Sequence, residues 1–360
     1  MILVGIAGLA AVAGGGLTWL ALSQKWGAAN ATQPTAVTGV STARPTTSTS
    51  PTPLDTPVQS SVTSTTLGTR WNIYRGHSGY IYGVTWASAD GQRIASASLD
   101  RTVQDWNATS GVRYFTYNHS SSVNDVKSSY DKQFLASASD DRSAQIRDAS
   151  AGTLLVTYRN HSGAVNTVEW SPLGGKIVTA SADTTVQIWD PQTGATFRTL
   201  QGHTAEVWAA GWSPDGQRIV SASADGTAIV WDATTGGILL TYSRHAATVR
   251  TVSWSPDGLY IASGSEDQTV HIWDAVTGAT RYIYHGHTER LRTVAWSHHG
   301  TRIVSGAKDN TAQIWDALAG THIYTYYGHT ATVFDAQWSS DDSRIASCST
   351  DETVQIWQAS

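Results

Sequence analysis

The sequence predicts an all-β fold in which seven copies of one four-stranded antiparallel unit surround a common axis. Two observations carry this prediction. A histidine recurs every 42 residues, and tryptophans stand at two fixed distances behind most of these histidines. The composition agrees, because 16 Trp, 32 Gly and only 14% charged residues in a chain of 360 indicate short strands and tight turns rather than long helices.

The composition also excludes several classes of protein. The chain has a single Cys, which excludes a disulfide framework and a thiolate metal cage. Its formal net charge of −5 supplies no basic field, so we expect no nucleic-acid partner. The sequence has no phosphate-cradling glycine loop and no calcium-loop spacing, and we expect neither a cofactor nor a metal.

Residues 1–25 have the character of a transmembrane anchor. No charged residue occurs from Ile2 to Leu22, and about 20 apolar residues suffice to span a bilayer. A cleaved secretory signal is the competing interpretation, with Ala29-Asn30-Ala31 as an A-x-A-like cleavage site. No basic residue precedes the apolar run, which weakens the signal interpretation and leaves the membrane topology open.

Residues 26–68 are predicted to form a disordered linker. The stretch from Thr32 to Thr66 contains 12 Thr, 6 Ser and 5 Pro among 35 residues. Such a segment buries too little apolar surface to offset its ordering entropy, and it is expected to be an extended stalk. A stalk behind an apolar run favours a single-pass membrane protein with its folded domain outside the cytoplasm, or alternatively a secreted protein.

Residues 69–360 repeat one motif seven times. The recurring histidines are His77, His119, His161, His203, His245, His287 and His329. A tryptophan follows nine residues later in every unit except the second, which has Ser128. A second tryptophan follows 28 residues after the histidine in units three to seven. Repetition therefore accounts for most of the tryptophans, and they need no ligand-binding explanation.

The fourth unit shows why each repeat forms a sheet. Ser213-Pro214-Asp215-Gly216 is a turn in which Pro presets φ and Gly accepts a positive φ. Alternating or β-branched residues flank this turn and the next one. The four predicted strands are Glu206 to Trp212, Arg218 to Ser223, Thr227 to Trp231 and Ile238 to Tyr242. A lone sheet exposes both faces, whereas stacking several around an axis buries them.

This unit resembles the WD40-repeat family of β-propellers. The resemblance rests on Gly202-His203, the Ser-Pro-Asp-Gly turn, Ser223-Ala224-Asp225-Gly226-Thr227 and Val230-Trp231-Asp232. It covers residues 69–360 in one register and implies a seven-bladed β-propeller of four-stranded blades. The seventh unit ends without an outer strand, while Thr69 to Arg75 stands before the first Gly-His. We therefore expect the N-terminal strand to complete the last blade and close the ring.

The resemblance implies a structural role for a recurring set of His, Ser or Thr, Asp and Trp. These are also the residue types of a hydrolase triad, but a hydrolase needs one nucleophile rather than seven. In the family's pattern the Asp orients the imidazole, and the hydroxyl bridges His and Trp. The expected structural tetrads are His161–Thr179–Asp183–Trp189, His203–Ser221–Asp225–Trp231, His245–Ser263–Asp267–Trp273, His287–Ser305–Asp309–Trp315 and His329–Ser347–Asp351–Trp357.

The first two units depart from the pattern. Unit one carries one extra residue before Asp100, and unit two has Arg147 where the second Trp stands elsewhere. The tetrads of these units are therefore doubtful, and we expect these two blades to open first in hydrogen exchange. His298-His299 replaces Pro-Asp in the turn of unit six, where a solvated turn is favoured over a metal site.

The resemblance places partner contacts on the narrow top face, three and five residues after each histidine and just before the turn Asp. The chain carries aromatic and cationic residues there, which are enriched in interface hot spots. They are Tyr80, Tyr82, Trp208 and Phe334, and a cationic arc of Arg250, Arg290, Arg292 and Lys308. We expect this face to bind an acidic or C-terminal peptide segment, with an ordinary solvated rim as the alternative.

Three classes of function remain. The favoured one is a non-catalytic, membrane-tethered scaffold whose monomeric propeller docks protein or peptide partners on its top face. The second is the sensory or ligand-binding domain of a kinase-type membrane signalling protein whose other half is missing from this chain. The third, an enzyme that uses the propeller channel, is disfavoured. The near identity of the units indicates recent duplication, which favours a bacterial source.

Overall fold

The computed structural model describes residues 66–360 of the protein. The chain divides into two compact units, residues 1–64 and residues 65–360, and the second contains every described residue. The predicted anchor at residues 1–25 and most of the predicted linker at residues 26–68 lie outside the described residues. Between residues 66 and 360, no helix has the length and apolar character needed to cross a bilayer.

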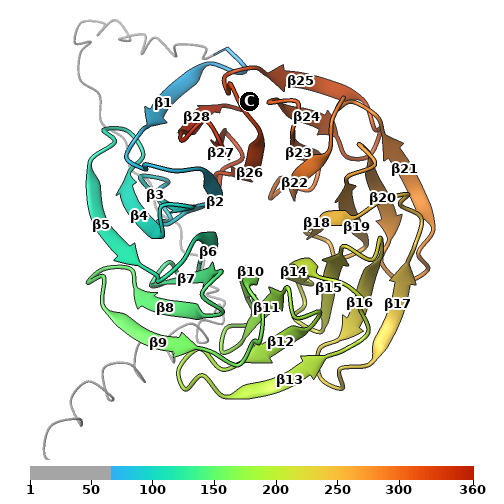
Figure 1. Cartoon of the computed structure of the whole chain (residues 1–360). Helices are drawn as coiled ribbons and strands as arrows, with labels where there is room; N and C mark the ends of the chain where they lie inside the picture. Colours follow the sequence, from blue (N-terminus) through green and yellow to red (C-terminus); the bar gives the residue numbers. More distant parts are fainter. Residues whose placement is uncertain (1–65) are drawn as a thin grey trace, which may run out of the picture. The chain divides into compact units, whose positions relative to one another are not determined.

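The described residues form seven four-stranded antiparallel blades in a ring around a central opening (Figure 1). Blade 1 contains β2 (Ile81–Trp86), β3 (Arg93–Ser98), β4 (Thr102–Asn107) and β5 (Arg113–Asn118). Blade 2 contains β6 (Val123–Ser128), β7 (Phe134–Ser139), β8 (Ala144–Asp148) and β9 (Leu154–Tyr158). Blade 3 contains β10 (Val165–Trp170), β11 (Ile177–Ser181), β12 (Val186–Trp189) and β13 (Thr196–Leu200).

The remaining blades follow the same order from the channel outward. Blade 4 contains β14 (Val207–Trp212), β15 (Arg218–Ser223), β16 (Ala228–Asp232) and β17 (Ile238–Tyr242). Blade 5 contains β18 (Val249–Trp254), β19 (Tyr260–Ser265), β20 (Val270–Asp274) and β21 (Thr280–Tyr284). Blade 6 contains β22 (Leu291–Trp296), β23 (Arg302–Ala307), β24 (Ala312–Asp316) and β25 (His322–Tyr326). Blade 7 contains β26 (Val333–Trp338), β27 (Arg344–Ser349), β28 (Val354–Gln358) and β1 (Arg70–Tyr74).

The prediction of an all-β, seven-bladed propeller is confirmed, and so is its closure. β1 pairs antiparallel with β28, with Ile73 opposite Gln355 and Tyr74 opposite Val354. The N–H of Gly68 also donates to the carbonyl of Gln358 across 2.8 Å. The last blade therefore takes its outer strand from the start of the described chain, as Figure 1 shows beside the C-terminus.

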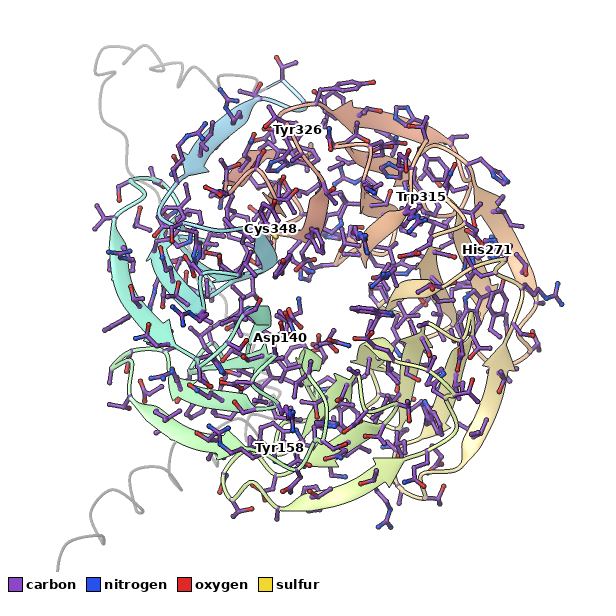
Figure 2. All side chains as sticks on the ribbon, in the orientation of Figure 1. Asp140, Tyr158, His271, Trp315, Tyr326 and Cys348 are labelled. Carbon is purple, nitrogen blue, oxygen red and sulfur yellow. The ribbon has the colours of Figure 1, made fainter. Side chains whose placement is uncertain are left out.

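A tyrosine at the end of an outer strand fastens most blades to the next one. Tyr242 of blade 4 stacks on Trp273 of blade 5, with the ring centroids 4.5 Å apart and the planes within 6°. Figure 2 places labelled members of this series, Tyr158, Trp315 and Tyr326, between outer strands and channel. Equivalent stacks, with centroids 4.2 to 4.7 Å apart, are Tyr74–Trp106, Tyr158–Trp189, Tyr284–Trp315 and Tyr326–Trp357.

The tyrosine hydroxyl adds a buried hydrogen bond to this stack. Between blades 5 and 6, Tyr284 Oη donates to Gln313 Oε1 across 2.6 Å. Between blades 3 and 4 apolar residues replace the pair, since Leu200 and Ile229 pack in one cluster with Trp231. The contact is thus made by a stack with a tyrosine hydrogen bond in five places and by aliphatic packing between blades 3 and 4.

The change Tyr284→Phe tests how much the hydrogen bond between Tyr284 and Gln313 contributes to stability. It keeps the stack but leaves Gln313 Oε1 buried without its donor, so we expect the free energy of unfolding to fall by about 1–2 kcal/mol. The double variant Tyr284→Leu/Gln313→Ile copies Leu200 and Ile229, and it is expected to lose less stability than the single variants Tyr284→Leu and Gln313→Ile lose together. Denaturant unfolding measures both, and an additive double variant would contradict the pairing.

Candidate functional site at the mouth of the propeller channel

Each blade brings together the predicted histidine, aspartate and hydroxyl. In blade 4, His203 Nδ1 donates to Asp225 Oδ2 across 2.8 Å, and His203 Nε2 lies 2.8 Å from Ser221 Oγ. In all seven blades the His–Asp distance is 2.8 to 3.2 Å. The distance from Nε2 to the hydroxyl is 2.8 to 2.9 Å.

The aspartate of each set also closes the turn that follows it. Asp225 Oδ2 accepts the N–H of Thr204, and Oδ1 accepts both the N–H and the O–H of Thr227. Burial raises the pKa of such a carboxyl, but the hydrogen bonds outweigh burial and lower the pKa of Asp309 and Asp351 to about 2. The aspartates therefore stay ionised at neutral pH and hold the turns closed.

The indole completes the set in four blades. Trp106, Trp231, Trp273 and Trp357 donate their Nε1–H to the serine hydroxyl across 2.8 to 3.2 Å. The expectation is wrong for Trp189 and Trp315, whose indole N–H groups have no partner within residues 66–360. In blade 3 the hydroxyl belongs to a threonine, Thr179, which lies 3.5 Å from the carbonyl oxygen of Gln187 instead. Nothing in the structure explains the case of Trp315.

Blade 1 forms a complete tetrad, contrary to the expectation from its extra residue. His77 lies 2.8 Å from Asp100 and 2.9 Å from Ser96, and Trp106 donates to the same serine across 3.2 Å. The extra residue falls in the turn between β2 and β3, so the strands keep their register.

Blade 2 lacks the indole, as its sequence indicates. His119 keeps its contacts with Asp141 at 3.2 Å and with Ser137 at 2.8 Å. Arg147 occupies the tryptophan position and donates to Gln145 Oε1 across 2.9 Å. Its guanidinium lies 4.9 Å from the centre of the Tyr117 ring. Which blades open first stays a prediction.

Blade 5 carries His271 at the position where five other blades have Gln and blade 4 has Ile229. Its Nδ1 lies 2.8 Å from Tyr242 Oη, and its ring stacks on His245 at 3.8 Å. Burial and the neighbouring His245 lower the pKa of His271 to about 4, so this imidazole is neutral at neutral pH. His245, Asp267 and His271 bring three potential metal ligands within 4.8 Å, although His245 and Asp267 already bond each other.

A β-bulge at the start of each inner strand directs one side chain into the channel. In blade 4, Val207 pairs with Ser223 and Ala209 with Ala222, which leaves Trp208 without an opposite residue. The same shift occurs in the other six inner strands. The bulged residues line a cavity of about 850 Å³ and are Tyr82, Asn124, Asn166, Trp208, Arg250, Arg292 and Phe334. Bulges commonly redirect side chains at functional sites.

Aromatic and cationic side chains lie side by side in this ring of bulged residues. The Arg250 guanidinium lies 3.7 Å from the centre of the Trp208 ring, and that of Arg292 lies 5.2 Å from the Phe334 ring. Tyr82 meets Phe334 edge to face at 4.8 Å. The predicted aromatic surface and cationic arc are therefore one surface, here called the channel mouth and defined by these five residues.

A carboxylate that the sequence reasoning left without a role lies among the arginines. Glu266 Oε1 is 2.6 Å from Arg250 Nη2 and 3.7 Å from Arg292 Nη1, and its Oε2 is 3.2 Å from Arg290 Nη1. Burial raises the pKa of Glu266, but the three guanidinium groups outweigh it and lower this pKa. One carboxylate faces three cations, so the cluster keeps a net positive charge. The sequence did contain a signal for this contact, because Glu266 stands just before the turn Asp of blade 5, next to the arginines of the predicted cationic arc.

The other predicted partner-binding residues stand apart from the cavity. Tyr80, Arg290 and Lys308 do not line it. Tyr80 is 45% exposed, and the side chain of Arg290 is 52% exposed. These three residues therefore extend the channel mouth outward onto the rim of the top face.

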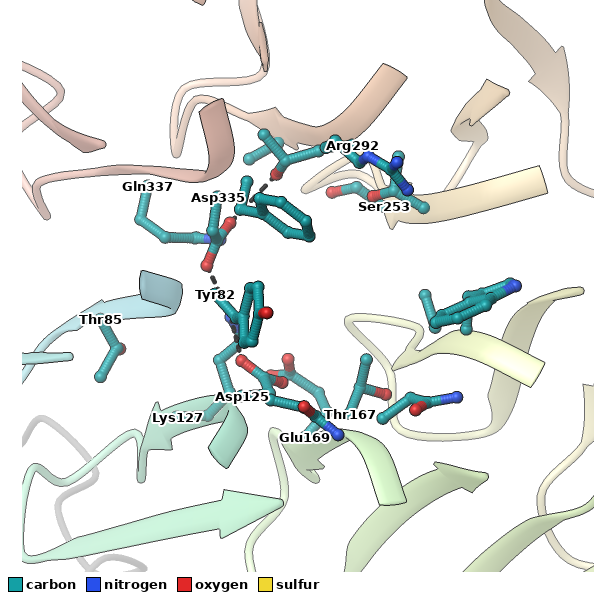
Figure 3. Close-up of a pocket in the computed structure, with 18 of the residues that line it drawn as sticks. Tyr82, Thr85, Asp125, Lys127, Thr167, Glu169, Ser253, Arg292, Asp335 and Gln337 are labelled. Atoms are coloured by element: carbon teal, nitrogen blue, oxygen red, sulfur yellow. Dashed lines mark hydrogen bonds and ion pairs between the residues drawn. The ribbon is translucent and has the colours of Figure 1, made fainter. Parts of the chain in front are cut away.

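Buried charges that the sequence reasoning missed lie deeper in the channel (Figure 3). Lys127 Nζ lies 3.2 Å from Asp125 Oδ1 and 3.3 Å from Asp335 Oδ2, so it joins blade 2 to blade 7. A Cβ at Gly83 of the intervening blade would lie 3.0 Å from Asp125 Cα, which explains the glycine there. Glu169 also lines the cavity, and burial raises its pKa to about 7.

The His298-His299 turn and the single cysteine are both structural features. His298 and His299 direct their backbone N–H groups and their Nδ1 atoms to the buried carboxylate of Asp342 in blade 7, at 2.6 to 2.9 Å. The two histidine side chains are thus exposed to solvent, while Asp342 of blade 7 holds their turn in place. Cys348 is buried, and burial raises its pKa well above the usual value, which makes the thiol unreactive.

Comparison with known proteins matches the repeats to a family. The family model described as "WD domain, G-beta repeat" matches seven segments, residues 68–104, 111–148, 152–190, 194–232, 236–274, 278–316 and 320–358. The matched segments span most of the chain and end with each third strand. A search of curated proteins found no match.

The change His271→Gln is expected to reduce the acid sensitivity of the fold. The pKa of His271 is lower in the folded state than in the unfolded state, so the unfolded chain binds the extra proton between about pH 4 and pH 6.5, and stability falls as the pH falls through that window. Between pH 8 and pH 5 the variant should gain roughly 2 kcal/mol over the unaltered protein. A difference that does not change with pH contradicts this, and Gln313→His should introduce the same sensitivity in blade 6.

Proposed function

The chain belongs to the WD40-repeat family, and from this we propose that it is a non-catalytic scaffold that docks protein partners at its channel mouth. WD40 propellers are typically protein-interaction scaffolds. The observation that supports this site best is the cluster of arginine and aromatic residues that the seven bulges direct to one place. Arginine and aromatic side chains carry most of the energy of many interfaces.

The chemistry of the mouth favours a partner segment with a free carboxylate, either an acidic side chain or a C-terminus. Arg250, Arg290 and Arg292 share one carboxylate, so two positive charges remain without a counter-charge in this cluster. Two N–H donors, Trp208 Nε1 and Arg292 Nε, are buried and have no hydrogen-bond partner among the described residues. Charge-assisted bonds to a carboxylate would satisfy such groups.

The burial of the repeated sets supports a non-catalytic role. The hydroxyls that carry the His contact belong to residues that are 0 to 5% exposed, for example Ser221 and Ser137. A nucleophile must reach its substrate, and these hydroxyls are already bonded to the imidazoles inside the blades. The His, Ser and Asp contacts therefore serve to hold each blade together.

The proposal includes a tether to a membrane, with the propeller outside the cytoplasm. The apolar run from Ile2 to Leu22 and the Thr-, Ser- and Pro-rich stretch behind it support this part. Fractionation of cells that express the full chain tests it, since a tethered propeller stays with the membranes after a high-salt wash and a secreted one does not.

The double change Arg290→Glu/Trp208→Ala tests the docking site. It reverses one charge of the cluster and removes the ring beneath Arg250, so we expect partner affinity to fall by about 30-fold or more, the scale of an interface hot spot. Affinity capture with the full chain followed by mass spectrometry identifies the partners, and titration of each one measures the loss.

The matched control is Arg198→Glu on the outer strand β13, which is exposed and does not line the channel cavity. It makes the same charge reversal and should leave every partner bound. If the double variant retains all captured partners while its thermal unfolding is unchanged, the channel mouth is not the docking site.

A further inference from the structure

The contact between blades 1 and 2 differs from the other interblade contacts of the described ring. Five core clusters each contain two tryptophans, for example Trp254 and Trp273 between blades 4 and 5. The cluster between blades 1 and 2 contains none, and its members include Val103, Tyr117 and Leu135. Ser128 and Arg147 stand where the two tryptophans stand elsewhere.

The first of these tryptophans has a defined place in the other blades. It inserts between two blades, and in five of the six it donates its indole N–H to a backbone carbonyl of the preceding inner strand, whereas the N–H of Trp212 has no partner within residues 66–360. Trp170, for example, donates to the carbonyl of Lys127 across 3.2 Å. The same bond, 3.1 to 3.2 Å long, is made by Trp86, Trp254, Trp296 and Trp338. In this register the carbonyl of Thr85 is the corresponding acceptor for blade 2.

A guanidinium covers the indole in several of these places. Arg218 lies 4.6 Å from the Trp254 ring, and Arg302 lies 4.9 Å from the Trp338 ring. The equivalent residue of blade 1, Arg93, also reaches the next blade, where it donates to the carbonyl of Ala149 across 2.8 Å. With no indole of the next blade to cover, Arg93 pairs with Asp105, a buried carboxylate at a position that is aliphatic in the other six blades, and lies 5.2 Å from the Tyr114 ring of its own blade.

The side chains at this place belong to the wall of the channel cavity. Thr85, Trp86, Ser128, Tyr130 and Lys132 all line it, and we call this cluster the blade 2 notch because a serine stands there in place of an indole. Lys132 is held at φ 60° in a turn position that is Gly91 or Gly216 in other blades, and its Nζ donates to the Trp86 carbonyl across 3.0 Å. A flexible lysine side chain thus stands beside the notch in a strained backbone conformation.

We propose that the blade 2 notch binds the side chain of a tryptophan presented by a partner protein at the face opposite the channel mouth. The fold itself indicates the occupant, because the same place is shaped around an indole in the other six blades. A bound indole would donate to the Thr85 carbonyl and lie beside the Lys132 ammonium, which is attracted to the face of an aromatic ring. This site is independent of the proposed docking at the channel mouth.

Indole itself is the probe for this site. Titration of the full chain with indole, followed by NMR of the tryptophan side-chain N–H signals, should show one saturable site that shifts the Trp86 signal. For a fragment of this size we expect a dissociation constant on the order of 0.1–1 mM. Cyclohexanol, a non-aromatic ring of similar reach, should bind at least about tenfold more weakly because it lacks the π face and the planar N–H donor.

Two variants of Ser128 separate notch binding from adsorption elsewhere. Ser128→Trp supplies the missing indole from the chain, so it should abolish indole binding and raise the melting temperature by a few degrees. Ser128→Ala removes only the hydroxyl and should leave the affinity within about twofold. If Ser128→Trp does not fold, the shift of Trp86 in the unaltered protein still decides the question.

Two results would overturn the proposal. One is the absence of saturable indole binding to the unaltered protein up to the solubility of indole. The other is indole binding that Ser128→Trp leaves unchanged, or that moves signals other than those around Trp86. The variant Arg290→Glu/Trp208→Ala changes the channel mouth and affects neither of these results. The two proposed sites are therefore tested independently.

Discussion

The pairing of β1 with β28 is the constraint on which the rest of the propeller depends. Each blade exposes both faces unless its neighbours cover them, so the interblade cores persist only while the ring is closed. β1 contributes to closure twice, because it completes blade 7 and because its Tyr74 stacks on Trp106 of blade 1. Inside the channel, Lys127 reinforces the same region by bridging Asp125 and Asp335 across blade 1.

Repetition separates the residues that hold the fold from those that can serve a partner. The His–Asp–hydroxyl contacts recur in every blade, and their buried polar groups are bonded to one another. The bulged position recurs as backbone geometry, yet its side chain differs from blade to blade, from Asn124 to Trp208 and Arg292. The same β-bulge in every blade therefore presents a different side chain at the channel mouth, and such a variable surface suits a docking scaffold.

The fold was largely predictable from the sequence because its determinants are local and repeated seven times. The strands of blade 4 and the closing strand were predicted to within a residue or two. The site was less predictable, since it depends on contacts between units. Residue spacing does not show that Glu266 collects three arginines or that Lys127 reaches Asp335, 208 residues away. Spacing also misjudged blade 1, where a turn absorbs the extra residue.

The most direct test of ring closure is native-state hydrogen exchange of the β1 amides in the full chain. The account predicts that the hydrogen-bonded amides of Arg70–Tyr74 open with the same free energy as those of β27 and β28, because the four strands of blade 7 form one cooperative sheet. Exchange of the β1 amides at the rate of a frayed end, while β27 and β28 stay protected, would contradict it.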